Sequence, residues 1–349
     1  MKRILLLAFA ALLLLPSVTA SPKKRYQVAG VAFYNLENLF DTINNNGKYD
    51  LEYTVKGNRK WDGTKYWNKI HNMAYAISQL KTDITPMGPA VIGVSEIENR
   101  SVLEDLVKDP QIKDCNYQII HHDSPDRRGV DVAMLYNPRM FRPLNATHHT
   151  LKIPGYETFR TRDQTCVSGL LLGEPVSIIV NHWPSRLGGQ QQSSYLREAA
   201  AALSKQIADS VLSVNPNQKI FIMGDLNDDP SNNSCAKIIG AKKKEKEVEK
   251  GGWFNPWWEV LDKGIGTLAY KGQWNLFDQI IINDNTLGKD RSTLKYFKCK
   301  VHNDIPGLKE TEGDRKGYPR RTFASGIYLN GFSDHFPTQV FLVKEIKNQ

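Results

Sequence analysis

The sequence predicts an α/β fold in which sheets and helices pack as layers. Seven short runs are rich in β-branched and apolar residues, and two longer stretches have the spacing of amphipathic helices. The chain has 349 residues, of which 40% are hydrophobic and 24% charged, so it can bury a large core and is neither disordered nor fibrous. Strands and helices that alternate along one chain cover each other's apolar faces, which produces layers.

The N-terminal segment has the pattern of a signal peptide. Lys2 and Arg3 precede an apolar run at 4–15, and Val18-Thr19-Ala20 offers a small-residue cleavage site. This run is shorter than the ~20 residues that span a bilayer, although an uncleaved membrane anchor is the alternative. We therefore expect residues 1–20 to be removed. Residues 21–349 would form one exported domain, periplasmic or extracellular, without stable insertion into a membrane.

The expected elements follow one another without a linker or an internal repeat. Helical spacing at 66–80 and 196–211 predicts two amphipathic helices, and Ser193 or Ser194 would cap the second. The seven expected strands are Val28–Phe33, Ala90–Val94, Val130–Leu135, Val176–Val180, Lys219–Met223, Gln279–Ile282 and Thr338–Val343.

Neither the net charge nor the cysteine content identifies a function. The net charge is +9, and +7 without Lys2 and Arg3, which suits a polyanionic partner and equally well plain solubility. The charge run at 242–252 fits a solvated loop or, alternatively, a basic loop that touches phosphates. The cysteines lack zinc-site spacing, so we expect core residues, with one disulfide of open pairing as the alternative. They are Cys115, Cys166, Cys235 and Cys299.

Four expected strands run directly into polar residues that can do chemistry. Each case alone is explained by a turn, because Asn, Asp and Gly end strands, but four together indicate a site where strands meet loops. The four segments are Asn35–Asn38, Ser95-Glu96, Asn181-His182 and Gly224–Asp228.

The residue types in these segments suit hydrolysis of a phosphoester with a bound metal. Glu96 and the acidic segment at 224–228 supply hard oxygens, which Mg²⁺ and Mn²⁺ prefer. His182 and His335 stand in polar segments, and Asp278 precedes an apolar run from which it could orient an imidazole. An oriented histidine could take a proton from water, while metal and neutral donors stabilise the charge on the phosphate oxygens.

Seven motifs follow one another along nearly the whole mature chain. They are NLEN (Asn35–Asn38), VSEIEN (Val94–Asn99), RRGVDVAMLY (Arg127–Tyr136), NHWPSR (Asn181–Arg186), GDLND (Gly224–Asp228), WNLFDQI (Trp274–Ile280) and GFSDHFP (Gly331–Pro337). In this order they resemble the endonuclease/exonuclease/phosphatase superfamily, and within it the exported bacterial branch. That superfamily includes pancreatic deoxyribonuclease, apurinic endonucleases, bacterial sphingomyelinases and inositol polyphosphate 5-phosphatases.

The resemblance implies a fold and a set of catalytic residues. The fold would be a four-layered α/β sandwich, with two mixed β-sheets packed face to face and helices outside. His335 would be the general base, paired with Asp278. Asp225 would orient the nucleophile or bind metal, His182 would donate a hydrogen bond to a phosphate oxygen, and Asn227 would hold the phosphate.

The resemblance also implies residues that bind metal and substrate. Glu96 would be the principal metal ligand, with a contribution from Asp334. Asn35 would help to position the metal-bound phosphate. Arg128 would contact phosphate, although Arg127 could serve equally.

Three further segments bear on specificity and cofactors. The WCDR-type motif of the inositol 5-phosphatases is missing, since LFDQ at 276–279 stands in its place, which disfavours phosphoinositides. The aromatic segment 253–258 could be a membrane-inserting hairpin, or core packing around a proline turn. The segment 44–52 fails as an EF-hand, because Thr42 and Tyr53 would occupy the first and last ligand positions, but a looser Ca²⁺ site is left open.

The leading hypothesis is a Mg²⁺-dependent nuclease that hydrolyses DNA or RNA phosphodiesters as a monomer. Basic residues near the motifs, such as Arg160, Arg162 and Arg186, would contact the phosphate backbone. The alternatives are a phosphatase, a sphingomyelinase-like phospholipid phosphodiesterase, or a binding module that has lost catalysis. A complete set of His, Asp, Asn and Glu residues argues against the binding module.

Overall fold

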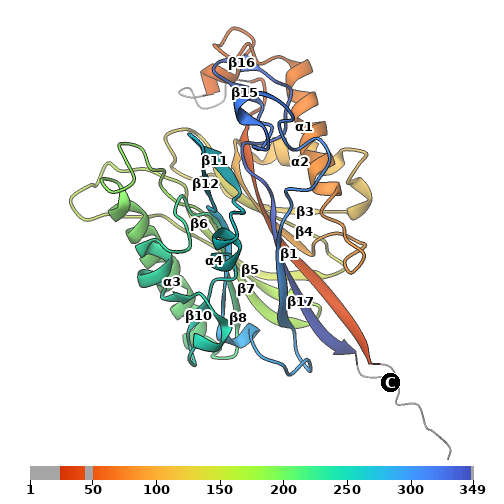
Figure 1. Ribbon diagram of the computed structural model, residues 1–349, viewed down its shortest axis with the longest axis vertical. Helices are drawn as coiled ribbons and strands as arrows, with labels where there is room; N and C mark the ends of the chain where they lie inside the picture. Colours follow the sequence, from red (N-terminus) through yellow and green to blue (C-terminus); the bar gives the residue numbers. More distant parts are fainter. Residues whose placement is uncertain (1–23, 44–49, 347–349) are drawn as a thin grey trace, which may run out of the picture.

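Two large β-sheets face each other in the computed structural model, which describes residues 24–43 and 50–346 (Figure 1). The predicted signal peptide and most of the calcium-like segment lie outside these residues. The six-stranded sheet has the order β14-β17-β1-β2-β4-β3, and the seven-stranded sheet has the order β5-β6-β7-β8-β13-β10-β9. Both sheets are mixed, because β1–β2, β7–β8 and β9–β10 pair in parallel and the other neighbours pair antiparallel.

The six-stranded sheet is built from the two ends of the chain. Its strands are β1 (Arg25–Leu39), β2 (Val91–Ile97), β3 (Gln118–His121), β4 (Asp131–Tyr136), β14 (Lys295–Val301) and β17 (Thr338–Ile346). The seven-stranded sheet comes from the middle of the chain. Its strands are β5 (Phe141–His149), β6 (Gln164–Leu171), β7 (Glu174–His182), β8 (Lys219–Asp225), β9 (Ala241–Lys242), β10 (Trp253–Phe254) and β13 (Asp278–Asn283).

Helices cover the outer faces of both sheets. Helices α1 (Gly63–Ser78) and α2 (Arg100–Lys108) lie outside the six-stranded sheet, and α3 (Ser194–Val214) lies outside the seven-stranded sheet (Figure 1). The short helix α4 (Trp258–Asp262) follows β10, and β11 (Leu268–Tyr270) with β12 (Gln273–Asn275) forms a small ribbon. A second ribbon pairs β15 (Phe323–Ala324) with β16 (Ile327–Tyr328). The predicted four-layered α/β sandwich is therefore confirmed.

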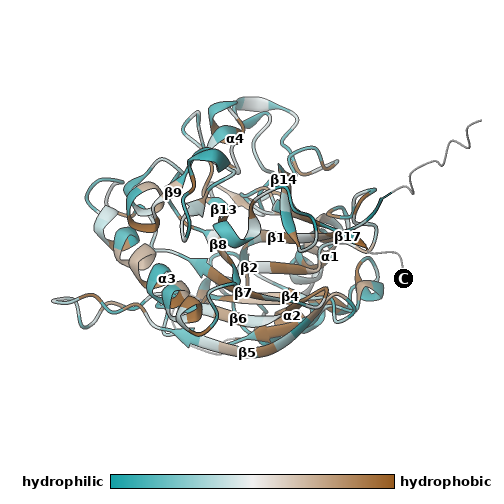
Figure 2. Cartoon of the chain, turned by 90° about the horizontal axis from the view of Figure 1, so that it is seen from below, coloured by the Kyte–Doolittle hydropathy of each residue, from teal (hydrophilic) through white to brown (hydrophobic). Residues whose placement is uncertain are grey.

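The alternation of apolar residues along the central strands explains the layers. In β8, Phe221 and Met223 belong to the core between the sheets, whereas Ile220 and Ile222 pack with α3 residues such as Ala201. Successive side chains of a strand point to opposite faces, so a continuous apolar run serves two cores at once. Figure 2 shows hydrophobic segments along the stacked strands and hydrophilic loops around them.

Two parallel strand–helix–strand units set up the site. In one, α1 connects β1 to β2, and in the other, α3 connects β7 to β8. Parallel strands need such a crossover, and their carboxyl ends meet at one edge of the sheet. Because β13 runs antiparallel to β8, its first residue, Asp278, lies opposite Asp225, the last residue of β8. The two units thus bring four strand ends to one end of the sandwich.

All seven predicted strands and both predicted helices are present. Ser193 is the N-cap of α3, although its side chain makes no capping hydrogen bond. The strands continue through the polar segments, so that Glu96, His182 and Asp225 are strand residues and not loop residues. The sequence did not predict α2, α4 or six strands of the two sheets. These strands are β3, β5, β6, β14 and the short β9 and β10.

The structure distinguishes between the alternative interpretations of the aromatic segment, the charge run and the cysteines. Trp253 and Trp257 are buried, so the aromatic segment packs in the core and forms no membrane hairpin. The charge run is exposed beside β9 and β10, and Trp253 pairs with Asn283 at the end of β13 remote from Asp278. The run therefore does not border the strand ends of the site. All four cysteines are unpaired in the described residues, and no described helix is long and apolar enough to cross a membrane.

Candidate active site

The backbone of the site is irregular at the positions that carry its side chains. The β1–β2 pairing shifts register between Asn35 and Leu39, and the β2–β4 pairing shifts between Ser95 and Ile97. Glu37, Asn38 and Glu96 have φ values of 46°, 52° and 58°, which is the left-handed region. Asn227 shares this conformation, with φ 51°. Bulges and left-handed residues cost stability and redirect side chains, which is why they gather at functional sites.

His335 and Asp278 are in direct contact in the site. The Nδ1 atom of His335 lies 2.7 Å from Oδ2 of Asp278, and both side chains are buried. Burial by itself would lower the pKa of His335, but the carboxylates of Asp278 and Asp225 outweigh it and raise this pKa well above its ordinary value. The two residues belong to opposite sides of the sandwich. They approach across the interface between the sheets and not as neighbours within one sheet.

Asp225 lies at the centre of the polar cluster. Its Oδ2 accepts a hydrogen bond from Nδ2 of Asn35 at 3.0 Å and lies 3.8 Å from Nε2 of His335. Burial raises the pKa of Asp225 to about 6, although the positive charge of His335 opposes this rise. A carboxyl group with this pKa can change its protonation near neutral pH, so Asp225 is placed to accept or return a proton.

His182 presents one nitrogen to two carboxylates. Its Nε2 lies 3.5 Å from Oδ2 of Asp225 and 3.8 Å from Oε1 of Glu96. Burial, together with the nearby Arg162 guanidinium, lowers the pKa of His182 well below its ordinary value. The imidazole is therefore neutral, and Nδ1 is buried without a hydrogen-bond partner in the described residues. The tautomer with hydrogen on Nε2 can donate to an oxygen placed between the carboxylates.

Glu96 is held ionised at the edge of the cluster. One oxygen accepts a hydrogen bond from the backbone of Asn38 at 3.0 Å, and Arg128 contacts both oxygens at 3.3 Å. Burial by itself would raise the pKa of Glu96, but the charge and the hydrogen bond of Arg128 outweigh it and keep this pKa well below its usual range. Of the two arginines that the sequence left open, Arg128 contacts the site. Arg127 instead donates to the carbonyl of Thr158.

The remaining predicted residues lie at the periphery of the cluster. Asn227 donates from Nδ2 to the carbonyl of Trp183 at 2.9 Å, and its backbone N–H donates to Asp225 at 3.0 Å. Oδ1 of Asp334 lies 3.9 Å from Nε2 of His335, and its Oδ2 accepts from Arg321 at 2.9 Å. The structure therefore places all the predicted site residues at this one end of the sandwich.

Known proteins support the family that these features indicate. The sequence profile of the Endonuclease/Exonuclease/phosphatase family matches residues 30–344. The chain belongs to this family. Enzymes of the family are phosphoester hydrolases and generally depend on a divalent metal ion. A search of curated proteins gives no match to the chain.

Solved structures of the family share the fold. Truncated TDP2 of Caenorhabditis elegans is 15% identical, with a TM-score of 0.52, over 90% of this chain and 97% of that one. A family protein of Bacteroides thetaiotaomicron is 16% identical, with a TM-score of 0.55, over 93% and 98%. A mannosyl-6-phosphatase from the same organism is 16% identical, with a TM-score of 0.54, over 90% and 99%. At these identities the likeness concerns the fold.

The carboxylates of the site are suited to bind the divalent ion on which enzymes of the family generally depend. Glu96 is ionised and its side chain is 12% exposed, so its oxygens can be reached from solvent. Asp334 is 30% exposed and adds a second carboxylate, and both offer the hard oxygens that Mg²⁺ prefers. By contrast, Glu37 is buried and already bonded, because Arg321 and the N–H of Thr322 donate to it at 3.1 and 2.7 Å.

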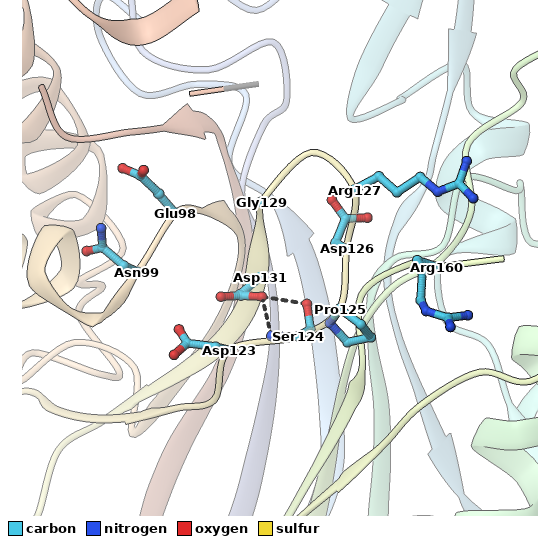
Figure 3. A pocket seen from close by; sticks show the side chains of 10 residues that line it. All are labelled: Glu98, Asn99, Asp123, Ser124, Pro125, Asp126, Arg127, Gly129, Asp131 and Arg160. Atoms are coloured by element: carbon cyan, nitrogen blue, oxygen red, sulfur yellow. Dashed lines mark hydrogen bonds between the residues drawn. The ribbon is translucent and has the colours of Figure 1, made fainter. Parts of the chain in front are cut away.

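A second group of possible ligands lies at the facing ends of β3 and β4 and in the loop between them. Atoms of His121, Asp123 and Asp131 lie within 4.8 Å of one another. Asp123 and Asp131 also line a pocket of about 650 Å³ (Figure 3). Asp131 already accepts from His121 Nε2 at 3.0 Å and from the N–H of Ser124 at 2.9 Å, so the group serves to hold this loop in place.

Several residues that support the site were missed or misread in the sequence. Oγ of Ser333 donates to the carbonyl of Asn35 at 2.7 Å and accepts from the N–H of His335 at 3.1 Å, which fixes the histidine loop against β1. Ser333 lies in a quoted motif, whereas Lys69, 3.7 Å from Glu37, gave no sequence signal. Arg162 is buried and donates to the carbonyl of His182 at 3.1 Å, so the expectation that it contacts substrate is wrong.

Proposed function

We propose that the protein is an exported, divalent-metal-dependent phosphodiesterase that acts as a monomer on nucleic acid. The observation that carries the hydrolytic part is the contact of 2.7 Å between His335 and Asp278, next to Asp225 and Glu96. An imidazole held at one nitrogen by a carboxylate, with the other directed at acidic ligands, is the arrangement expected of a base for water.

His335 in its neutral form would take the proton of the attacking water at Nε2, and because Asp278 and Asp225 raise its pKa, the population of this form should increase as pH rises. Asp278 fixes the proton on Nδ1, so that Nε2 is the nitrogen directed toward Asp225. Water adds to phosphorus, and the bond from phosphorus to the leaving oxygen breaks. That oxygen takes up the proton that His335 removed from water, either directly from Nε2 or through Asp225, whose Oδ2 lies 3.8 Å from Nε2 and whose pKa is about 6, and His335 is thereby restored.

Neutral and positive donors would stabilise the charge that develops on the phosphate. Nε2 of His182 and Nδ2 of Asn35 both face Asp225, and Arg128 lies against Glu96. Donors placed in a buried site need no reorganisation during the reaction, which makes them effective. A divalent ion, when bound by Glu96 and Asp334, would supply further positive charge beside these oxygens.

The choice of nucleic acid rests on charge around the site. Arg59, Arg315 and Arg321 line one neighbouring pocket. Exposed Arg127 and Arg160 line another, in which four carboxylates also lie, those of Glu98, Asp123, Asp126 and Asp131. Basic groups on two sides of a phosphate site suit a chain that carries one phosphate per nucleotide. Export is inferred from the signal-peptide pattern at 1–20.

A phosphomonoesterase is the second candidate. One structure with the same fold is a mannosyl-6-phosphatase, and the strand-end cluster has nothing that requires a diester. The two candidates share the catalytic residues and differ in what the surrounding loops admit.

A substrate panel separates the candidates. Single- and double-stranded DNA, RNA, bis-p-nitrophenyl phosphate, sphingomyelin, inositol phosphates and mannose 6-phosphate would each be assayed with Mg²⁺, Mn²⁺ or EDTA. The proposal predicts metal-dependent cleavage of nucleic acid with a kcat/KM above that of every monoester. Faster turnover of a monoester would select the phosphatase. Secretion of the full-length chain, with cleavage near residue 20, would test export separately.

A further inference from the structure

A pocket beside the strand-end cluster is lined by three arginines and is not used by the proposed chemistry. The arginines are Arg59, Arg315 and Arg321, and the pocket has a volume of about 370 Å³. We call it the arginine pocket. This volume lies near the lower end of the range for small-molecule sites, ~300–1,000 Å³.

The arginine pocket shares its wall with the candidate active site. Asn38 lines it, and the N–H of Asn38 donates to Glu96 at 3.0 Å. Arg321 also lines it and donates to Asp334 at 2.9 Å. A molecule that occupied both spaces would therefore pass along the residues next to the two proposed metal ligands.

One of the three guanidinium groups, that of Arg315, lacks a close carboxylate partner in the described residues. The nearest carboxylate oxygen to Arg315 belongs to Glu310 and lies 3.9 Å away. Arg59 lies 3.3 Å from Glu52, but its buried Nε makes no hydrogen bond to the described residues. The guanidinium of Arg59 instead lies over the ring of Phe323, with 5.1 Å to the ring centre.

The carboxylate in the wall does not neutralise this charge. Glu37 is 5% exposed, and its oxygens accept from Arg321 and from the N–H of Thr322. Glu37 also lies 3.7 Å from the ammonium group of Lys69. Its negative charge is thus shared between two cations, and Arg315, which has no carboxylate closer than 3.9 Å in the described residues, is left to face an outside anion.

The rim of the pocket is a tight turn. Ser325 and Gly326, between β15 and β16, have φ values of 49° and 80°, as a two-residue hairpin turn requires. A Cβ atom built on Gly326 would meet nothing within 4 Å, so the space beside the turn is open.

We infer that the arginine pocket binds a second phosphate of the substrate, one nucleoside away from the phosphate that is cleaved. Guanidinium groups offer paired N–H donors that match two phosphate oxygens, and they keep their charge at any physiological pH. The inference rests on the proposed function, because the first phosphate must occupy the cluster of Glu96, His182 and His335. It extends that function by naming the recognised unit: two phosphates joined through one nucleoside.

Binding of two nucleotides tests the inference without turnover. Thymidine 3′,5′-bisphosphate and thymidine 5′-monophosphate differ by the second phosphate alone. Calorimetry with Mg²⁺ and the full chain should give a dissociation constant roughly tenfold lower for the bisphosphate, the gain expected from one set of charged hydrogen bonds. In Arg59→Ala/Arg315→Ala the two constants should become equal. Arg142→Ala, an exposed arginine on β5, is the matched control and should keep the difference.

Three results distinguish a failure of this inference from a failure of the proposed function. Equal affinities in the unaltered protein would overturn the inference, and so would a tenfold preference that survives in the double variant. Arg315→Ala alone, in which a side chain that is 40% exposed is lost, repeats the test if the double variant is unstable. Hydrolysis of thymidine 5′-(p-nitrophenyl phosphate), which has no second phosphate, reports on the proposed function alone. Its absence would reject that function whatever the nucleotides show.

Discussion

His335 and Asp278 meet across the two sheets, with Nδ1 of the imidazole 2.7 Å from Oδ2 of the carboxylate. Asp278 begins β13 of the seven-stranded sheet, and His335 lies in the loop that leads into β17 of the six-stranded sheet. The base of the proposed reaction thus depends on how the sheets are aligned, and a substitution in either sheet can disturb it.

Loss of the imidazole should reduce turnover strongly. We expect His335→Gln to lower kcat by about 10²–10⁴, the usual contribution of a positioned base, while an amide N–H remains to bond Asp278. Asp278→Asn should also lower kcat, because an amide favours the wrong tautomer of the imidazole. The check is kcat on bis-p-nitrophenyl phosphate, with the unfolding temperature measured in parallel. Unchanged kcat in both variants would remove His335 from the role of base.

Loss of the Glu96 charge should weaken metal binding. Glu96→Gln keeps the shape of the side chain but removes the ionised oxygen, so affinity for Mg²⁺ or Mn²⁺ should fall by at least about tenfold. Calorimetric titration of the variant with either metal measures this. Glu104→Gln, which breaks an exposed ion pair with Arg100, is the control and should bind metal normally. Equal metal affinity in the two variants would contradict the role given to Glu96.

Binding to duplex DNA should depend steeply on salt. Each neutralised phosphate releases counterions, which gives a log–log slope of roughly −0.9 per contact. Arg127→Ala removes an exposed guanidinium beside the site and should make the slope less negative by about 1. Arg142→Ala, on the outer strand β5, should leave it unchanged. Affinity measured by anisotropy between 50 and ~300 mM salt would decide, and a flat salt dependence would argue against a polynucleotide substrate.

Stability should fall in mild acid because of His302. Nε2 of this buried residue lies 2.8 Å from Oε1 of Gln339, and burial lowers its pKa to about 4. The unfolded chain binds the proton near pH 6.5 and the folded chain near pH 4, so the free energy of unfolding decreases as pH falls through this window. The full effect is about 3 kcal/mol. Urea unfolding of His302→Gln, which keeps a donor to Gln339, should show a flatter pH dependence than the original chain.

A methyl group on Gly224 should disrupt the second strand–helix–strand unit. A Cβ atom there would lie 2.2 Å from the carbonyl oxygen of Asn181, so β7 and β8 would have to separate. We expect Gly224→Ala to cost about 1–3 kcal/mol of stability and to reduce kcat by displacing Asp225. Gly63→Ala, at the start of α1 with open space around it, is the control. Denaturant unfolding that shows equal stability for the two variants would contradict this account.

The sequence was most informative where the chain repeats a local pattern. The strands around Phe33 and Met223 could be predicted because their apolar runs are buried on both faces, and the motifs marked their ends. The outer strand β5 could not, since most of its residues are exposed and lack a clear alternation. Family resemblance, and not periodicity, supplied the pairing of His335 with Asp278. Spacing along the chain carries no information on contacts between sheets.

The arginines are a second example of contacts that the sequence could not predict. Arg128 and Arg162 both lie near polar motifs, and the sequence predicts a phosphate contact equally well for either. The fold separates them, because Arg162 is buried under the carbonyl groups that follow β7. No feature of the sequence pointed to Arg321, because nothing near it in the chain indicates that its side chain contacts Glu37.

The left-handed backbone of the candidate site lowers the stability of the fold at residues that the proposed reaction needs. These residues are Glu37, Asn38, Glu96 and Asn227. Each of these residues holds a conformation that glycine adopts without strain, at a cost on the order of 1 kcal/mol. Replacement by glycine would relieve this strain but remove side-chain contacts, such as those of Glu96 with Arg128 and of Glu37 with Arg321. The same replacements would remove groups of the candidate site, so selection for a more stable variant should include selection for turnover.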